Sequence, residues 1–177
     1  MRRRIIFIVT FISVIALLLT SCSVGVTQMR IFDNDDKTTD KRLEQVIEAI
    51  SKHDKAALKA MFSSKALSGA NNFDGSMDYL FDFFQGSVSS YNRDAGPLVD
   101  ESTDHGDKVK EVKTWYSVNA NKQKYLFFLL EYTEDTGHSD NVGLYTLRVI
   151  RAEDEKTQFR NWQDMKVPGI YKPDNQK

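Results

Sequence analysis

The segment Tyr125-Leu126-Phe127-Phe128-Leu129-Leu130-Glu131-Tyr132 carries the strongest β-strand signal in this chain of 177 residues. Side chains alternate between the two faces of a strand, so residues two apart share a face. One face holds Tyr125, Phe127 and Leu129, and the other holds Leu126, Phe128, Leu130 and Tyr132. Both faces are apolar, whereas a strand with one solvated face alternates apolar with polar residues. We therefore expect this strand to be covered on both sides.

Further strands are expected on either side of this segment in the sequence. Residues 109–118 and 143–151 alternate with a period of two, and turn-forming residues separate each of them from 125–132. A shorter strand is expected at 88–91, which the sequence Asp-Ala-Gly-Pro at 94–97 interrupts. Short connections favour antiparallel pairing, so the last three strands are expected to form a meander.

Helices are expected before the strands. A stripe of apolar residues at i, i+3, i+4 and i+7 predicts a first helix from near Asp40. Asp54 suits the N-cap of a second, short helix, and a third is expected from about Ser76 to Gln85, after a loop at 63–75. Helices followed by a meander indicate an α+β fold, with N-terminal helices packed on a curved antiparallel sheet. The members of the first stripe are Leu43, Val46, Ile47 and Ile50.

This order of elements resembles the cone-shaped fold of the nuclear transport factor 2-like superfamily. The residues that carry the resemblance are 43–50, 52–54, 58–62, 115–116 and 125–132. The resemblance covers residues 40–171 and implies a pocket between the helices and the concave face of the sheet. Superfamily members include isomerases, dehydratases and many non-catalytic binding modules, so the fold alone does not choose the function.

The helices can cover only one face of the segment 125–132. The other face can be covered by the C-terminal segment, which contains the apolar residues Phe159, Trp162 and Ile170. A second copy of the protein is the alternative cover, since superfamily relatives often pair through the outer face of the sheet. An aromatic tail of this length gives the chain its own cover, so we favour a monomer over a homodimer.

The first twenty-two residues have the pattern of an export signal. Three arginines follow Met1, a mostly apolar run spans residues 5–19, and Leu-Thr-Ser-Cys ends the segment at 19–22. The run is shorter than the roughly 20 residues that a membrane-spanning helix needs. The ending resembles the lipobox of bacterial lipoproteins, which implies lipid on the sulfur of Cys22 and cleavage between Ser21 and Cys22. A plain signal peptide and an uncleaved membrane anchor are the alternatives.

We therefore expect a protein held by lipid on the outer face of a bacterial cell membrane. Its expected segments are a signal peptide at 1–21, a flexible tether at 22–39, a single α+β cone domain at 40–171 and a frayed tail at 172–177. Together with the lipobox, the chain is similar to small lipoproteins of Gram-positive bacteria whose domain has no assigned function. Cys22 is the only cysteine, so no disulfide can form within the chain.

The charge balance argues against nucleic acid as a partner. The chain carries 24 Lys and Arg against 25 Asp and Glu, and the signal segment takes three arginines and no acid with it. The exported part is therefore mildly acidic, with a net charge of −4. Nucleic-acid binding needs a basic face, and adhesion to anionic lipid by charge needs one as well.

No established catalytic or metal-binding motif occurs in the sequence, and no cofactor is expected. The serine-hydrolase elbow, the P-loop, the zinc-protease helix and the dinucleotide glycine pattern are all missing. The acidic run at 33–36 lacks the glycine that a calcium loop requires at its sixth position. Asp104, His105 and Asp107 crowd one turn, which favours a solvated turn over a metal site.

Glu131 is the most informative single residue for chemistry. If its face points into the cone, an apolar pocket would favour its protonated form, and Glu131 could act as an acid or base. We favour the alternative, in which Glu131 lies at the strand end and reaches solvent. The candidate pocket residues are Tyr116, Glu131, Tyr145 and Trp162.

Three functions remain open from the sequence. The leading hypothesis is a non-enzymatic lipoprotein whose domain binds a small ligand, a peptide or a partner protein outside the cell. The rival is an enzyme acting on a small hydrophobic substrate, with Glu131 as acid or base and Tyr116 or Tyr145 as hydrogen-bond donor. The third is an immunity-type or accessory protein. A pocket with inward Glu131 and two inward tyrosines would favour the enzyme, and a filled cone would favour a protein-binding or accessory role.

Overall fold

The structure, a computed structural model, describes residues 23–159 and 165–173, with side chains described from Asn34 onward. By its internal contacts the chain divides into a unit that ends at Thr38 and a unit of Thr39–Lys177. The first unit contributes the beginning of a helix, and the second contains the sheet. The following account concerns the second unit unless stated otherwise. Cys22, Ser21 and Trp162 lie outside the described residues.

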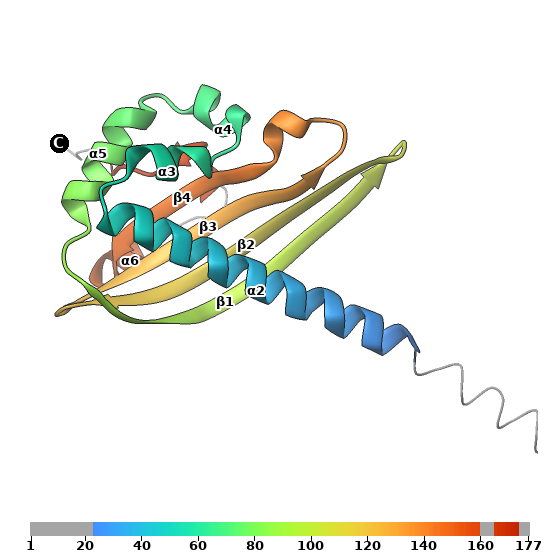
Figure 1. The fold of residues 1–177 in the computed structure, drawn as a ribbon, viewed down its shortest axis with the longest axis horizontal. Helices are drawn as coiled ribbons and strands as arrows, with labels where there is room; N and C mark the ends of the chain where they lie inside the picture. Colours follow the sequence, from blue (N-terminus) through green and yellow to red (C-terminus); the bar gives the residue numbers. More distant parts are fainter. Residues whose placement is uncertain (1–22, 160–164, 174–177) are drawn as a thin grey trace, which may run out of the picture. The chain divides into compact units, whose positions relative to one another are not determined.

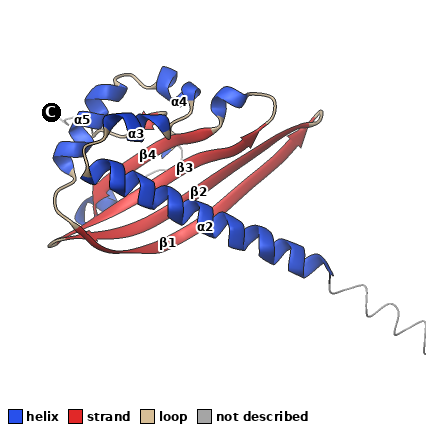
Figure 2. Ribbon diagram, in the orientation of Figure 1, coloured by secondary structure: helices blue, strands red, loops and turns tan. Residues whose placement is uncertain are grey.

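The second unit is a five-stranded sheet with helices, as expected for an α+β fold (Figures 1 and 2). The strands lie in the order β1-β2-β3-β4-β5 and do not close into a barrel. Strands β1 to β4 pair antiparallel, which confirms the predicted meander, and β5 pairs parallel with β4. The strands are β1 (Val88–Asp104), β2 (Asp107–Ala120), β3 (Gln123–Asp135), β4 (Gly143–Arg151) and β5 (Gly169–Ile170). The helices are α2 (Ser23–Ser51), α3 (Lys55–Ala60), α4 (Ser64–Gly69), α5 (Phe73–Phe83) and α6 (Glu155–Gln158), with 3-10 turns η2 (Ser139–Asn141) and η3 (Ala152–Asp154).

Helix α2 begins at Ser23, well before the start near Asp40 that its apolar stripe predicts. The residues expected to form an irregular tether continue the helix instead. Between Gly25 and Ser51 the sequence contains neither proline nor glycine, so no residue in it stops a helix. The Thr38 hydroxyl donates to the carbonyl oxygen of Asn34 at 2.8 Å, a contact typical of threonine inside a helix. Whether this segment serves as a spacer from the membrane stays a prediction.

The short helices are fixed by side-chain caps. Asp54 caps α3 as predicted, accepting from the amide of Ala57 at 2.9 Å. The expectation of an uninterrupted loop at 63–75 is wrong, because Ser63 caps α4 and Asn72 caps α5 in the same way. Serine and asparagine are common in loops, but both also rank among the best N-cap residues.

Strand β1 continues through Gly96-Pro97, where we expected an interruption of the strand. The strand is at the edge of the sheet, so a proline without an amide hydrogen does not break a ladder on both sides. The register with β2 shifts twice near this point, between Arg93 and Ala95 and between Ala95 and Leu98. These shifts allow the strand to resume its pairing beyond the proline.

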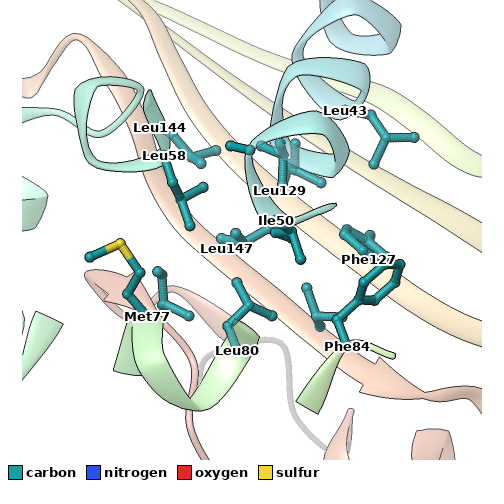
Figure 3. Packing of buried hydrophobic residues seen from close by; sticks show 14 of the residues in the cluster. Leu43, Ile50, Leu58, Met77, Leu80, Phe84, Phe127, Leu129, Leu144 and Leu147 are labelled. Atoms are coloured by element: carbon teal, nitrogen blue, oxygen red, sulfur yellow. The ribbon is translucent and has the colours of Figure 1, made fainter. Parts of the chain in front are cut away.

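The larger core cluster lies between the helices and one face of the sheet (Figure 3). Helix α2 contributes the predicted stripe, and β3 contributes the side chains of Tyr125, Phe127 and Leu129. This confirms the assignment of the two faces of β3. The most deeply buried members include Leu43, Leu58, Tyr116, Phe127 and Leu147, each fully or almost fully shielded from solvent.

A second, smaller cluster covers the opposite face of the sheet. It is formed by Phe128, Leu130 and Tyr132 of β3 together with Met165, and Phe159 packs against it. The prediction that the C-terminal segment covers this face is therefore confirmed for Phe159. It is wrong for Ile170, which joins the larger cluster on the helix side because β5 extends the sheet beside β4.

The C-terminal segment is held to the sheet by polar contacts as well. Buried Arg148 donates to the carbonyl oxygen of Gln158 at 2.8 Å, and its guanidinium lies 3.8 Å from the ring centre of Tyr171. Thr146 donates to the carbonyl oxygen of Val167 at 2.6 Å. Each contact joins β4 to a residue of the tail, so the segment is positioned along its length.

Glu111 on β2 forms the charged contact between the tail and the sheet. Its carboxylate accepts from Lys166 at 2.6 Å and also binds Lys113. Burial alone would raise the pKa of Glu111, but the bonds from Lys113 and Lys166 outweigh burial and leave the pKa below its ordinary value.

We expect this carboxylate to make the protein less stable in acid. A group whose pKa is lowered by folding stabilises the fold above its unfolded pKa of about 4.3, and this contribution is lost as the pH falls through the folded value. Urea unfolding at pH 7 should show Glu111→Gln less stable than the parent by about 1 kcal/mol. The gap should shrink towards pH 3. A gap that stays constant with pH would contradict an ionised Glu111 in the fold.

Candidate functional site

The inner face of the sheet carries polar groups that meet helix α2. The Tyr116 hydroxyl donates to Asp40 at 2.9 Å, and Arg93 binds the same carboxylate at 2.7 Å. One turn further along α2, Glu44 accepts from the hydroxyl of Tyr91 at 2.8 Å. Burial, followed by the bond to Asp40, raises the pKa of Tyr116 to about 12. Tyr116 is therefore a protonated, fully buried donor that is already occupied.

Glu131 also faces α2, where Arg42 binds it. The guanidinium of Arg42 contacts both carboxylate oxygens, with Nε at 3.1 Å from each and Nη2 at 2.5 Å from Oε1. Gln45 accepts from the remaining Nη1 at 3.2 Å. Glu131 is 7% exposed, so the expectation that it reaches solvent is wrong. The alternative, an unpaired carboxyl group in an apolar pocket, does not describe it either.

Tyr145 lies apart from these residues. The register of β3 and β4 shifts between Leu130 and Glu131, opposite the position of Tyr145. Its ring meets the ring of Tyr132 edge to face, with centroids 5.7 Å apart, and Tyr132 belongs to the smaller cluster. Of the four candidate pocket residues, Tyr116 and Glu131 therefore share the helix side, with different partners, and Tyr145 packs against both clusters.

The inner arrangement suits attachment of the helix better than chemistry. Two of its three carboxylates, Asp40 and Glu131, are each bound by an arginine, and the third, Glu44, accepts from Tyr91. A general acid or base must reach a substrate proton within hydrogen-bond distance, and these oxygens are engaged by the protein itself.

A groove of about 310 Å³ opens on the other face of the sheet. Its apolar wall is formed by Trp115, Leu126, Phe159 and Met165. Among the described residues that line it, the charged side chains are two carboxylates, Asp94 and Glu155, and none is basic. Trp115 packs against Phe128 with ring centroids 4.8 Å apart, which fixes its position on the sheet. We call this hollow the outer groove.

Two local features place the carboxylates of the outer groove. Asp94 falls at the register shift between Arg93 and Ala95, and such a bulge turns one side chain away from the regular alternation. The Ser117 hydroxyl of the neighbouring strand donates to Asp94 and holds it. Glu155 begins α6, directly after η3. The groove is thus assembled from strands β1, β2 and β3 and the segment that follows β4.

Sequence reasoning did not identify the outer groove. Asp94 begins the segment that is expected to interrupt the first strand, and Glu155 lies in a segment for which the sequence pattern predicts no definite structure. One signal was present in the sequence. Trp115 alternates with Tyr116, so one of these two large rings had to face away from the helices.

A second hollow of about 400 Å³ lies between α2 and α3. Its charged groups already have partners, since Arg42 binds Glu131 and Lys52 binds Glu48 at 2.6 Å. Within residues 23–159 and 165–173, no cluster of three or more His, Cys, Asp or Glu side chains is arranged to hold a metal ion. None of the described helices combines the length and the apolar character needed to cross a membrane.

Comparison with known proteins assigns the chain to a family. No curated protein sequence matches it significantly. The family model described as Domain of unknown function (DUF5104) matches residues 45–152, from within α2 to the start of η3. The match includes strands β1 to β4. It therefore includes Arg93 and Glu131, the residues through which the sheet forms its two ion pairs with α2. Because the model covers more than half of the sequence, the chain belongs to the DUF5104 domain family.

Proposed function

We propose that this protein is a lipoprotein, held on the outer face of a bacterial membrane by lipid on Cys22, whose domain is a non-enzymatic binding module. The domain is proposed to be a nuclear transport factor 2-like cone with a filled interior. The outer groove is its proposed ligand site. The protein is proposed to act as a monomer, because its own C-terminal segment packs against the outer face of the sheet.

The observation that carries the proposal is the contrast between the two faces of the sheet. On the helix side, Tyr116 and Phe127 are fully buried and the carboxylate of Glu131 is bound by Arg42. On the other side, an apolar wall and two carboxylates surround about 310 Å³ of open space. A concave, mostly apolar site with a few polar groups is the usual form of a ligand pocket.

The rival function, catalysis with Glu131 as acid or base, has less support. Three hydrogen bonds from Arg42 would have to break before Glu131 could take or give a proton. The hydroxyl of Tyr116 would have to leave Asp40 to donate to a substrate. The protein would then lose two contacts that fasten α2 to the sheet, which makes a binding role the simpler assignment.

Native mass spectrometry of the gently purified protein tests the proposed binding. A retained molecule, or a mass shift on addition of a ligand library, is expected for the parent protein. The same shift should be lost on replacing Met165 with glutamine, which puts an amide into the groove wall. The same substitution at Met61, near α3, provides the control. Retention that is lost with Met61 instead would place the ligand elsewhere.

The lipid anchor has its own test. Replacing Cys22 with alanine removes the only sulfur that lipid can be attached to, so the exported protein should move from the membrane fraction to the soluble fraction or remain uncleaved. Detergent partitioning and the mass of the processed chain measure this. Each buried methylene of an acyl chain contributes roughly 0.8 kcal/mol, so the shift should be nearly complete. Normal processing with unchanged partition into detergent would contradict lipidation of Cys22.

A further inference from the structure

We infer that the outer groove binds a cationic group carried on a short apolar stem. The chemistry is that of an ammonium or guanidinium group, which either a free organic amine or the lysine or arginine side chain of a polypeptide can supply. This inference rests on the proposed function, because it names the ligand class of the same groove. The charges, the walls and the size of the groove each support it.

The charge of the lining has one sign. Asp94 and Glu155 are both solvent-exposed, and neither forms an ion pair with any residue in the described ranges. The bond from Ser117 leaves the charge of Asp94 intact, because a hydroxyl donor does not neutralise a carboxylate. Two unpaired carboxylates beside an apolar wall favour a cation and disfavour an anion.

Arg148 lies close to the groove wall but is not part of the described lining. Arg148 lies under Phe159, with its guanidinium 5.7 Å from the ring centre, but it is 3% exposed. Its guanidinium is directed to the carbonyl oxygen of Gln158 and to the ring of Tyr171. Arg148 therefore supports the ring of Phe159 and adds no charge to the described lining of the groove.

The apolar wall suits the apolar stem that carries the cationic group of the ligand. Leu126 and Met165 are less than one tenth exposed, and the rings of Trp115 and Phe159 complete the lining. Aromatic rings also attract cations through the negative face of the ring, in addition to the apolar contact with the stem. An anionic or neutral ligand of equal size would gain the apolar contact only.

The size of the groove limits the ligand. A volume of about 310 Å³ is at the lower end of the range of roughly 300–1,000 Å³ found for small-molecule sites. A single lysine-like or arginine-like side chain fits this space, as does an amine of a few carbons. A large cofactor does not fit.

Methyl NMR of the full chain in dodecyl maltoside micelles tests the inference. The Met165 methyl group lines the groove, whereas Met61 and Met77 belong to the helix side and serve as internal controls. We expect n-butylamine and the capped tripeptide Gly-Lys-Gly to shift the Met165 signal saturably, without moving Met61 or Met77. n-Butanol and butyrate, which have similar stems, should bind at least about fivefold more weakly.

The carboxylates are tested by substitutions that keep their shape. Asp94→Asn removes the charge but retains an acceptor for Ser117. Glu155→Gln removes the charge of the residue that begins α6 and keeps the size of its side chain. Each should weaken amine binding by roughly three- to fivefold, and together by about tenfold or more. Asp82→Asn on α5, outside the groove, is the matched control and should leave binding unchanged.

The outcomes separate this inference from the proposed function. If the peptide binds more tightly than the amine, a polypeptide supplies the cation, and the reverse order indicates a free amine. Equal binding of butanol, butyrate and butylamine would overturn the inference while leaving a binding groove. Amine binding that survives both carboxamide substitutions would overturn it as well. If no molecule of any charge moves Met165, and no retained ligand is found, both the inference and the groove as a binding site fail.

Discussion

A chain that ends at Gln158 should self-associate and lose most of its stability. Deleting residues 159–177 removes Phe159 and Met165 from the smaller cluster and removes β5 from the sheet. It would expose Phe128, Leu130 and Tyr132, each less than one tenth exposed in the intact chain. Burying a large apolar side chain contributes about 1.5–3 kcal/mol, so the loss should be about 5 kcal/mol or more. Sedimentation velocity and urea unfolding measure both effects.

A chain that ends at Tyr171 provides the control. It keeps β5 and the contact between Tyr171 and Arg148, and it should remain monomeric with unchanged stability. The point substitution Met165→Ser offers a milder test if the long deletion does not fold, with an expected loss of about 2 kcal/mol. If the chain ending at Gln158 stays monomeric and as stable as the parent, the tail is not the cover of this face. A second copy of the protein would then be the better candidate.

Replacing Arg42 with alanine should lower the free energy of unfolding by about 2–4 kcal/mol. The change leaves the buried carboxylate of Glu131 without its partner, and an uncompensated charge in a low-dielectric setting is costly. The side chain of Arg42 is 24% exposed, which places the expected loss below that of a fully buried pair. Urea unfolding of the chain beginning at Asp33 measures the effect.

A double-mutant cycle with Glu131→Gln isolates this pair. Once the charge of Glu131 is removed, Arg42→Ala should cost much less, which gives a coupling energy of at least about 1 kcal/mol. Lys52→Ala is the matched control, because Lys52 and Glu48 form an ion pair in which both side chains are more than half exposed. Such exposed pairs contribute little to stability, because water and salt screen them. An Arg42→Ala loss no larger than that of the control would show that Glu131 is not held as a buried ion.

The local elements of this fold follow from local chemistry. The apolar stripe of α2, the cap at Asp54 and the two-residue alternation of β3 each depend on residues close together in the sequence. The ends of helices and strands are harder to predict from the sequence, because a Ser-rich or Asn-rich stretch can form a loop or can cap a helix. The same ambiguity explains why α4 and the first turn of α5 lie in a segment that was expected to be a loop.

The candidate site shows where sequence reasoning stops. The alternation of β3 places Glu131 on the helix side, and the structure agrees. That Arg42 lies opposite it depends on how α2 crosses the sheet, and these two residues are 89 positions apart. No local pattern carries that information, because a salt bridge of this kind is decided by packing over the whole domain.

By itself the sequence determined that β3 must be covered on both faces, since an octapeptide with apolar residues on both sides cannot be exposed to water on either. Only the tertiary structure decided what covers each face and where space remains. The helices fill one side with the larger cluster, while Met165 and Phe159 cover part of the other and leave the outer groove beside Asp94 and Glu155. The physical reason is that hydrophobic burial is non-directional. It requires a cover for each face but does not specify which segment provides the cover. The covering segment is specified by register shifts and ion pairs, and these join residues that are distant in the chain.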